Sequence, residues 1–336
     1  MRLERIQKKI KKNRLDGFLV TNPKNVYYLS NFSGTGIKLL LKEKEALFFS
    51  GPLYYEEAKE TVEKSFKLVR DFEAKFFRGL KRIGIEENSL YLKDYFYLQK
   101  LLPGIKFIPC RNFIEDFRLI KEEAEIELLK KSARITRNVF SSLLKELKPG
   151  MSELKVANRV RYSLREKGAE DESFPPIVAS GVRSSFPHAL PSKKIIEEKE
   201  PIILDFGGSF QRYQSDFTRT IFLGKIGRKE SKLKRLLKKA QDLAMAKIRP
   251  GVMISEIDQA ARHFLEGEGY GKYFIHSLGH GVGLNVHELP LISSKNRKRL
   301  KPGMVFTLEP GVYIPGWGGL RREDMVVVTK NGCEKL

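Results

Sequence analysis

The segment that most clearly offers chemistry is "HSLGHGVGLNVHE", residues 276–288, which holds three of the chain's five histidines. Glycines at positions 279, 281 and 283 run through the segment. Glycine lets the backbone approach another group closely, which leaves neighbouring imidazoles uncrowded. Imidazole is both a metal ligand and an acid or base near neutral pH. The segment therefore predicts a site rather than part of a core, and such a site needs partners from elsewhere in the chain.

Four acids on apolar, strand-like segments are the candidate partners. They are Asp205 in "IILDFGG", Asp216 in "YQSDFTRTIFL", Glu309 in "VFTLEPG" and Glu323 in "LRREDMVVV". A buried carboxylate is costly unless it is paired or metal-bound. Any one of them could lie at an exposed strand end, but four beside a histidine cluster favour a metal centre.

Four carboxylates and one imidazole can hold two divalent ions about 3.5–4 Å apart, as in two-metal hydrolases. Such a pair lowers the pKa of a bridging water and polarises a scissile carbonyl. Because the donor set is rich in oxygen, Mn²⁺ is the expected metal, with Co²⁺, Fe²⁺ and Zn²⁺ as alternatives.

A degenerate internal repeat indicates how these residues are brought together. "KPGMSELKVANRVRYSL" from residue 148 resembles "RPGVMISEIDQAARHFL" from residue 249, and "HALP" from residue 188 resembles "HELP" from residue 287. Each copy is followed by an acid that ends an apolar strand and then by a second acid. The sequence thus predicts two related lobes that face a shared centre.

Residues 1–118 alternate between helical and strand patterns. "RLERIQKKIKKNRLD" reads as an amphipathic helix, "GFLVT" as a strand, and "IKLLLKEKEALFFS" as two strands around a charged turn. Residues 118–147 form a long helical stretch closed by Pro149-Gly150. We expect one domain at residues 1–118 and a second at residues 119–336.

The net charge of +22 raises the question of nucleic-acid binding. The densest basic run, "RKESKLKRLLKK" at residues 228–239, contains apolar residues at helical spacing, so its lysines fall on the solvated face of a helix. The repeating positions are Leu233, Leu236, Leu237, Ala240, Leu243 and Ala244. We therefore expect no specific nucleic-acid partner.

Localisation is suggested by cysteine content and hydropathy. Two distant cysteines, Cys110 and Cys333, are too few for a disulfide framework and favour a reducing compartment. The N-terminus has no apolar signal region, and no stretch approaches the roughly 20 apolar residues of a membrane span. A cytoplasmic protein without a membrane partner is expected.

Taken together, "HSLGHGVGLNVHE", "LDFGGSFQRYQSDFTRT", "TLEPGVY" and "LRRED" resemble the signature segments of the pita-bread metallopeptidases. The resemblance is to the proline-specific branch, Xaa-Pro dipeptidase (prolidase) and aminopeptidase P, and covers roughly residues 118–336. "NPKNVYYLSNFSGTG" resembles the smaller N-terminal domain of that branch. The family resemblance implies an α+β fold, in which a C-terminal pita-bread domain with a pseudo-two-fold repeat is preceded by a smaller α/β domain. A homodimer is also implied.

The resemblance implies a role for each candidate ligand. Asp216 and Glu323 would bridge two metal ions, Asp205 would complete one ion, and His280 with Glu309 would complete the other. Glu309 would also handle the proton of the bridging water.

The remaining histidines are implied to serve substrate. His287 would hydrogen-bond the developing tetrahedral species, and His276 would line the active site. His188, in "SFPHALPS", matches a substrate-side histidine. The fifth histidine, His263, falls on a predicted helix and is expected to be structural.

Arg321 lies two residues before Glu323, so in an extended strand both side chains point to one face. Two roles are open: its guanidinium could anchor the carboxylate of a bound dipeptide, or it could pair with a ligand carboxylate and orient it. Arg322 stands where the family commonly has an apolar residue, and nothing in the sequence explains it.

The expected activity is hydrolysis of the peptide bond before proline in small peptides, most simply as an Xaa-Pro dipeptidase. An aminopeptidase P acting on longer peptides is the alternative. A non-catalytic binding module on this fold and metal-free creatinase-like hydrolysis are both disfavoured by the complete ligand set. A methionine aminopeptidase is disfavoured by the additional N-terminal domain.

Overall fold

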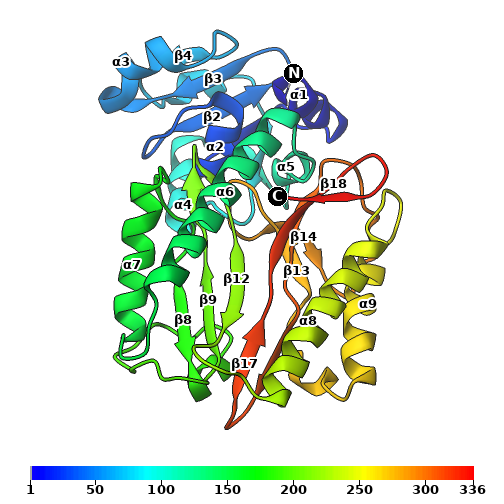
Figure 1. Ribbon diagram of the computed structural model, residues 1–336. Coiled ribbons are helices and arrows are strands. Elements are labelled where there is room, and N and C mark those ends of the chain that lie inside the picture. The colour runs from blue at the N-terminus through cyan, green and yellow to red at the C-terminus, as the bar shows by residue number, and fades with distance from the viewer. Residues whose placement is uncertain (1) are drawn as a thin grey trace. The chain divides into compact units, whose positions relative to one another are not determined.

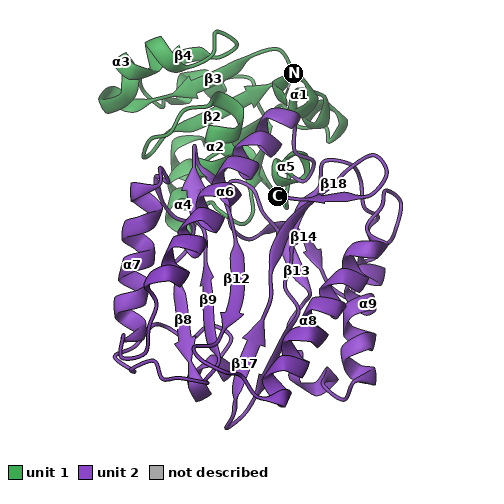
Figure 2. Ribbon diagram, viewed as in Figure 1, with its two compact units in different colours: residues 1–118 green, residues 119–336 purple. Residues whose placement is uncertain are grey.

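The computed structural model describes residues 2–336 and divides into two compact units, with the division after Arg118 (Figure 2). Unit 1 is a six-stranded sheet with helices, and unit 2 is a larger arrangement of β-sheets flanked by helix pairs. None of the helices in the part described combines the length and apolar character needed to cross a bilayer.

The sheet of unit 1 has the strand order β4-β3-β2-β1-β5-β6. The pairs β3–β4, β1–β5 and β5–β6 are parallel, whereas β1–β2 and β2–β3 are antiparallel. Every residue of β1 is buried, as expected for a strand covered on both faces. The elements are α1 (Arg2–Lys12), β1 (Gly17–Val20), α2 (Pro23–Ser30), β2 (Lys38–Lys42), β3 (Ala46–Phe49), α3 (Gly51–Thr61), β4 (Lys67–Val69), β5 (Arg82–Glu86), α4 (Leu92–Leu101), β6 (Lys106–Cys110) and α5 (Glu115–Arg118).

In unit 2, one helix pair lies on each side of the strands, α6 and α7 on one side and α8 and α9 on the other (Figure 1). Its two main sheets, both antiparallel, have the orders β12-β9-β8 and β14-β13-β15-β18-β19. Two smaller sheets have the orders β11-β10-β7 and β16-β17. The helices are α6 (Glu123–Glu146), α7 (Glu153–Glu166), α8 (Arg228–Lys247) and α9 (Ile254–Gly267). The strands are β7 (Asp171–Glu172), β8 (Ile177–Ser180), β9 (Ile202–Phe206), β10 (Gly208–Phe210), β11 (Tyr213–Gln214), β12 (Phe217–Ile221), β13 (Gly279–Gly281), β14 (Glu288–Ile292), β15 (Val305–Leu308), β16 (Gly311–Ile314), β17 (Gly318–Arg321), β18 (Asp324–Val328) and β19 (Cys333–Lys335).

The two halves of unit 2 repeat the same local architecture, as the sequence repeat predicts. In each half a Pro-Gly turn precedes the second helix of the pair and is fastened to the segment before a ligand-bearing strand. The equivalent contacts are Gly150 N to Ile196 O and Gly251 N to Leu300 O, and the isolated bridges are Ser152–Ile195 and Met253–Arg299. The halves thus present β9 and β15, each ending at a candidate ligand, in related surroundings.

The long predicted helix at residues 118–147 begins later than expected, at Glu123. Glu122 and Glu125 form a capping box that fixes this start, because each side chain accepts from the backbone of the other. Lys121, just before the box, donates its backbone N–H to Gly303 O instead. The residue before the capping box is therefore held against the second half of the unit.

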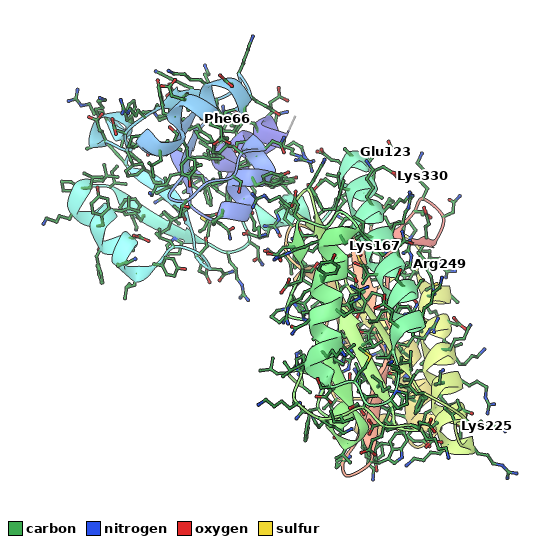
Figure 3. All side chains as sticks on the ribbon, turned by 60° about the vertical axis from the view of Figure 1, so that its left-hand side comes forward. Phe66, Glu123, Lys167, Lys225, Arg249 and Lys330 are labelled. Carbon is green, nitrogen blue, oxygen red and sulfur yellow. The ribbon has the colours of Figure 1, made fainter. Side chains whose placement is uncertain are left out.

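The basic helix α8 has the two faces that its spacing predicts. Five of its six apolar repeat positions are buried, and Leu243 is partly buried. Exposed basic side chains also stand on either side of α8, at Lys225 and Arg249 (Figure 3). The charge density of this region is therefore that of a solvated helix face.

The two sheets meet where β12 runs beside the segment between β17 and β18. Arg219 and Arg322 form an antiparallel bridge there, and Glu323 N donates to Thr218 O at 3.0 Å. A Cβ at Gly207 would lie 1.7 Å from Ser215 O, so only glycine permits the close turn after β9. This seam is where the candidate ligands converge.

Candidate metal centre

One cavity of about 460 Å³ in unit 2 is lined by every residue that the sequence singled out for metal, substrate or catalysis. The remaining lining is mostly apolar, which is typical of sites for small organic ligands. The singled-out residues are His188, Asp205, Asp216, His276, His280, His287, Glu309, Arg321 and Glu323. The structure therefore brings together residues that are separated by up to 135 positions in the chain, whereas His263 lies exposed on α9, outside the cavity.

Strand ends supply the candidate ligands. Asp205 lies within β9, and Asp216 immediately precedes β12, which pairs with β9. In the other half, His280 lies within β13 and Glu309 immediately follows β15, its neighbour. Glu323 lies between β17 and β18, at the seam.

The tightest group of donor atoms is formed by Asp216, His280 and Glu323, all buried, whose ligand atoms lie within 4.8 Å of one another. His280 Nε2 lies 3.5 Å from Asp216 Oδ2 and 3.4 Å from Glu309 Oε1. Nδ1 of His280 lies 3.1 Å from Gly281 O, which fixes the ring with Nε2 facing the acids. Imidazole and carboxylate donors converge here as a divalent ion requires.

Burial raises the pKa of the acids at this centre. The pKa values of Asp216 and Glu323 lie well above their ordinary values, through desolvation first and the neighbouring carboxylates second. Desolvation also raises the pKa of Glu309, to about 8. The charged forms of these groups repel one another in a poorly solvated cavity, so added positive charge would favour their ionised forms.

Desolvation lowers the pKa of His280 to about 4, so its ring is neutral at pH 7 and can act as a ligand. The carboxylate of Asp205 offers a further sign: among the described residues its Oδ1 has no hydrogen-bond partner although it is buried. An orphaned buried carboxylate oxygen is rare. A pair of divalent ions fits this donor set, since it would satisfy Oδ1 and neutralise the carboxylates.

A hydrogen-bonded chain orders one wall of the cavity. Arg321 donates from Nη2 to Asp205 Oδ2 at 2.5 Å and from Nη1 to the Tyr313 hydroxyl at 2.6 Å. That hydroxyl lies 3.1 Å from His276 Nε2. Nε of Arg321 reaches Thr218 Oγ1 at 3.3 Å. Each nitrogen of the guanidinium thus donates to an acceptor of the protein.

Two of these partners, Tyr313 and Thr218, were missed by sequence reasoning. Thr218 donates to Glu323 Oε2 at 2.6 Å, and desolvation first raises the pKa of Tyr313, to about 12, so its hydroxyl stays protonated. Tyr313 stands four residues after Glu309 and Thr218 two after Asp216, so proximity to a ligand is the signal that could have found them.

A partly buried ion pair on α9 supports the segment that leads into β13. Asp258 pairs with Arg262 at 2.9 Å and accepts from Leu278 N at 3.0 Å. Arg262 donates to Phe274 O and His276 O at 2.9 Å and 2.8 Å. Because the pair holds three backbone groups of residues 274–278, it fixes the approach of the histidine segment to the cavity.

His287 packs against the proposed ligand His280, with ring centroids 3.9 Å apart. The residue is exposed, and the pKa of its ring is lowered by desolvation first and by His188 second. The lowered pKa keeps the His287 ring neutral at pH 7, so it adds no positive charge where metal cations would bind, and His188 lines the same cavity. Both have room for a ligand in the cavity between them.

The cavity brings together four carboxylates and an imidazole in partly apolar surroundings. Such a set of side chains is typical of metal-dependent hydrolases. The chain belongs to metallopeptidase family M24, whose model matches residues 127–330, and the Creatinase/Prolidase N-terminal domain matches residues 2–120. The family uses divalent metal ions, and the protein is accordingly a metal-dependent peptidase.

Relatives match the chain over nearly its whole length. An Xaa-Pro dipeptidase of Pyrococcus horikoshii is 39% identical over 97% of this chain and 93% of its own. The solved structure of an Xaa-Pro dipeptidase from Bacillus anthracis has a TM-score of 0.96 and 36% identity, covering 99% of this chain and 96% of its own. An X-Pro aminopeptidase from Thermotoga maritima has a TM-score of 0.91 and 32% identity, covering 98% and 97%. The pita-bread fold expected from the motifs is confirmed.

The raised pKa values predict how stability responds to metal removal. The pKa of Glu309 is raised from the ordinary glutamate value of 4.5 to about 8 in the native protein. Between these two pH values, Glu309 therefore binds more protons in the native protein than in the unfolded chain. The free energy of unfolding of chelator-treated protein should therefore fall as pH rises through this window. Bound metal should abolish the fall. Urea unfolding at several pH values, with and without chelator, measures both slopes; a chelated protein that gains stability across the window would contradict the assignment.

A second prediction concerns the buried pair Lys121–Glu288, which joins the residue after His287 to the segment before α6. Lys121 Nζ lies 2.5 Å from Glu288 Oε1, and both side chains are almost fully buried. Removing one partner strands a charge, so Lys121→Met should cost about 3–5 kcal/mol of stability, and Lys121→Met with Glu288→Leu should recover much of it. Lys238→Met, from the exposed pair Lys238–Asp242, is the control and should cost about 0–1 kcal/mol. Denaturant unfolding decides, and additive losses in the double variant would show that the two side chains are not coupled.

Proposed function

We propose that this peptidase hydrolyses the bond before proline in dipeptides, as an Xaa-Pro dipeptidase with two manganese ions. The observation that carries the proposal is the convergence of all nine predicted residues on one cavity, with an unpartnered carboxylate oxygen on Asp205. Full-length similarity to Xaa-Pro dipeptidases of two Pyrococcus species, at 39% and 37% identity, supports the substrate class.

We assign Asp216 and Glu323 as bridging ligands, Asp205 to one ion, and His280 and Glu309 to the other. Mn²⁺ suits the predominance of carboxylate oxygens over nitrogen. When bound, two such ions lower the pKa of a water and polarise the scissile carbonyl.

The protein's own groups then handle protons and position. Glu309 accepts the proton of the attacking water and delivers it to the departing proline nitrogen, which has no N–H of its own. His287 donates an N–H to the oxygen that gains negative charge, and its neutral ring has a proton to share. His188 and His276 line the path of the substrate, and His276 is oriented by Tyr313.

The apolar part of the cavity suits the proline ring. Besides the polar groups, the wall includes aliphatic, aromatic and proline side chains that offer no competing hydrogen bonds, and proline has a fixed φ that such a wall can accommodate. These side chains are Phe174, Pro175, Ile177, Pro187, Leu190, Val286 and Leu291. A pocket of this kind favours proline over residues that need a partner for an amide N–H.

Hydrolysis of longer peptides, as in an aminopeptidase P, is the second candidate, and the structural similarity to an X-Pro aminopeptidase favours it. A non-catalytic module has no use for five ligand positions and is not proposed. We further propose a homodimer in the cytoplasm, with small peptides as its partners; the two unpaired cysteines are compatible with a reducing compartment.

Substrate length is tested with purified enzyme and Mn²⁺. The proposal expects cleavage of an Xaa-Pro dipeptide with kcat/KM well above that for the matched Xaa-Pro-Xaa tripeptide, and none for an Xaa-Ala control. Preference for the tripeptide would establish the aminopeptidase instead. Cleavage of Xaa-Ala at the Xaa-Pro rate would reject proline specificity.

Alanine variants of His280 and His287 should lose activity for different reasons. His280→Ala removes a nitrogen donor and should lose metal, whereas His287→Ala should keep metal and lower kcat by about 10²–10³-fold, the cost of one oxyanion donor. Metal content by elemental analysis and initial rates separate the two. His263→Ala, on the outer face of α9, is the matched control and should change neither. Equal metal loss in the His280 and His287 variants would show that the roles are wrongly assigned.

For Arg321 the contacts with Asp205, Thr218 and Tyr313 favour the orienting role over the anchoring of substrate carboxylate. Lysine cannot reproduce this planar fork. Arg321→Lys should therefore lower kcat on an Xaa-Pro dipeptide and on its C-terminally amidated analogue alike. A rise in KM confined to the free-acid dipeptide would restore the anchoring role.

A further inference from the structure

Behind the metal centre lies a second, much smaller cavity, on the side of the seam that faces α8. Arg321 and Glu323 project into the large cavity, whereas Arg322, between them, turns away and donates to Gln241 Oε1 of α8 at 3.0 Å. Arg219, its neighbour across the antiparallel bridge, also turns away from the metal centre. The small cavity is lined by Arg219, Thr220, Lys234, Leu237, Leu320, Arg321 and Arg322, so Arg321 borders both cavities.

The side chains that line this cavity include several basic residues and no acidic one. Arg219 and Arg322 stand directly opposite each other across the strands, an arrangement that is destabilising for like charges. Lys234 adds a third cation from α8. The nearest paired carboxylate, Asp324, binds Arg219 at 2.5 Å and is shared with Lys335 at 3.0 Å.

Hydrogen-bond donors are also left over. Among the described residues, the side chain of Arg322 has one hydrogen-bond acceptor, Gln241, which engages Nε and leaves both Nη groups available. Lys234 forms no ion pair within residues 2–336; its ammonium lies 5.8 Å from the centre of the Phe222 ring. Arg219, by contrast, is held by Asp324 and by the carbonyl oxygens of Thr218 and Glu323. Among the described residues, no carboxylate is hydrogen-bonded to Arg322 or to the exposed Lys234, although Asp324 and Asp242 lie near enough to attract the Arg322 guanidinium.

The volume limits what could fill it. The cavity measures about 30 Å³, close to the share of one water molecule in the liquid. A halide ion is of comparable size, whereas a phosphate or a carboxylate-bearing metabolite would extend beyond the cavity into the open space around it. A monovalent anion would accept charge-assisted hydrogen bonds from the free guanidinium and ammonium groups.

We propose that this cavity binds a single halide-sized anion, chloride in ordinary solution, held by Arg322 and Lys234 with Arg219 behind them. The anion offsets the repulsion between the paired arginines and so stabilises the bridge that joins β12 to the segment carrying Glu323. It also gives Arg322 a role on this chain: a donor to an anion rather than an element of the basic surface.

The direct test is crystallographic. Crystals of the metal-loaded protein grown in sodium bromide should give an anomalous bromine peak among Arg219, Lys234 and Arg322. Bromine peaks at other sites with none in this cavity would overturn the proposal.

The solution test measures thermal unfolding of the metal-loaded protein against chloride, with gluconate replacing it at constant ionic strength so that general screening stays fixed. A ligand that binds the native state raises Tm as its concentration exceeds Kd. Arg322→Gln should weaken the chloride response about tenfold or more, as expected for losing a charge-assisted donor. Lys234→Gln, an exposed substitution that leaves the strands untouched, should weaken it in the same direction.

Arg235→Gln is the matched control, because it removes the same charge from an exposed position of α8 that does not line the cavity. Its chloride response should equal that of the unmodified protein. Identical responses in the Arg322, Lys234 and Arg235 variants would reduce the effect to net charge and overturn the proposal. Tighter binding of sulfate than of chloride would refute the size argument in the same way.

Discussion

The burial of four carboxyl groups around one point is the constraint on which the rest of unit 2 depends. Desolvation raises the pKa of Asp216, Glu309 and Glu323, and each further charge raises the cost of the others. Arg321 supplies one compensating charge and directs it at Asp205. A single guanidinium cannot offset four carboxylates, so the arrangement is stable in its charged form only with additional positive charge, as two divalent ions provide.

The four acids repel one another, so a rigid backbone is needed to hold them together. The two halves of the unit each contribute paired strands ending at a ligand, and cross-sheet hydrogen bonds such as Glu323 N to Thr218 O join them. Close approach is enforced by glycine: a Cβ at Gly279 would lie 2.0 Å from Thr307 O. The backbone around Gly279 is packed too closely to admit a methyl group. Packing this close also prevents the movements by which the carboxylates could separate.

The ligand set could be predicted from sequence because each ligand is flanked by its own local signal. An acid that ends an apolar strand is conspicuous, as is a histidine among alternating glycines. Tyr313, Thr218 and Lys121 carry no such signal, because their importance comes from partners far along the chain; Lys121 meets Glu288 across 167 residues. The start of α6 at Glu123 depends likewise on a capping box and on a contact to Gly303, which helical periodicity alone does not register.

Alternation along one short segment explains how the front and the back of the metal centre are connected. Arg321 and Glu323 face the large cavity, while Arg322 and Asp324 face away from it, toward Gln241 and Arg219 respectively. Arg219 donates hydrogen bonds to this segment at two points, the carboxylate of Asp324 and the carbonyl oxygen of Glu323. Any charge added to or removed from the rear therefore acts on the same backbone that holds a ligand in front. In an extended strand neighbouring side chains point to opposite faces, so the fold cannot place Glu323 at the metals without also setting its two neighbours against α8 and β12.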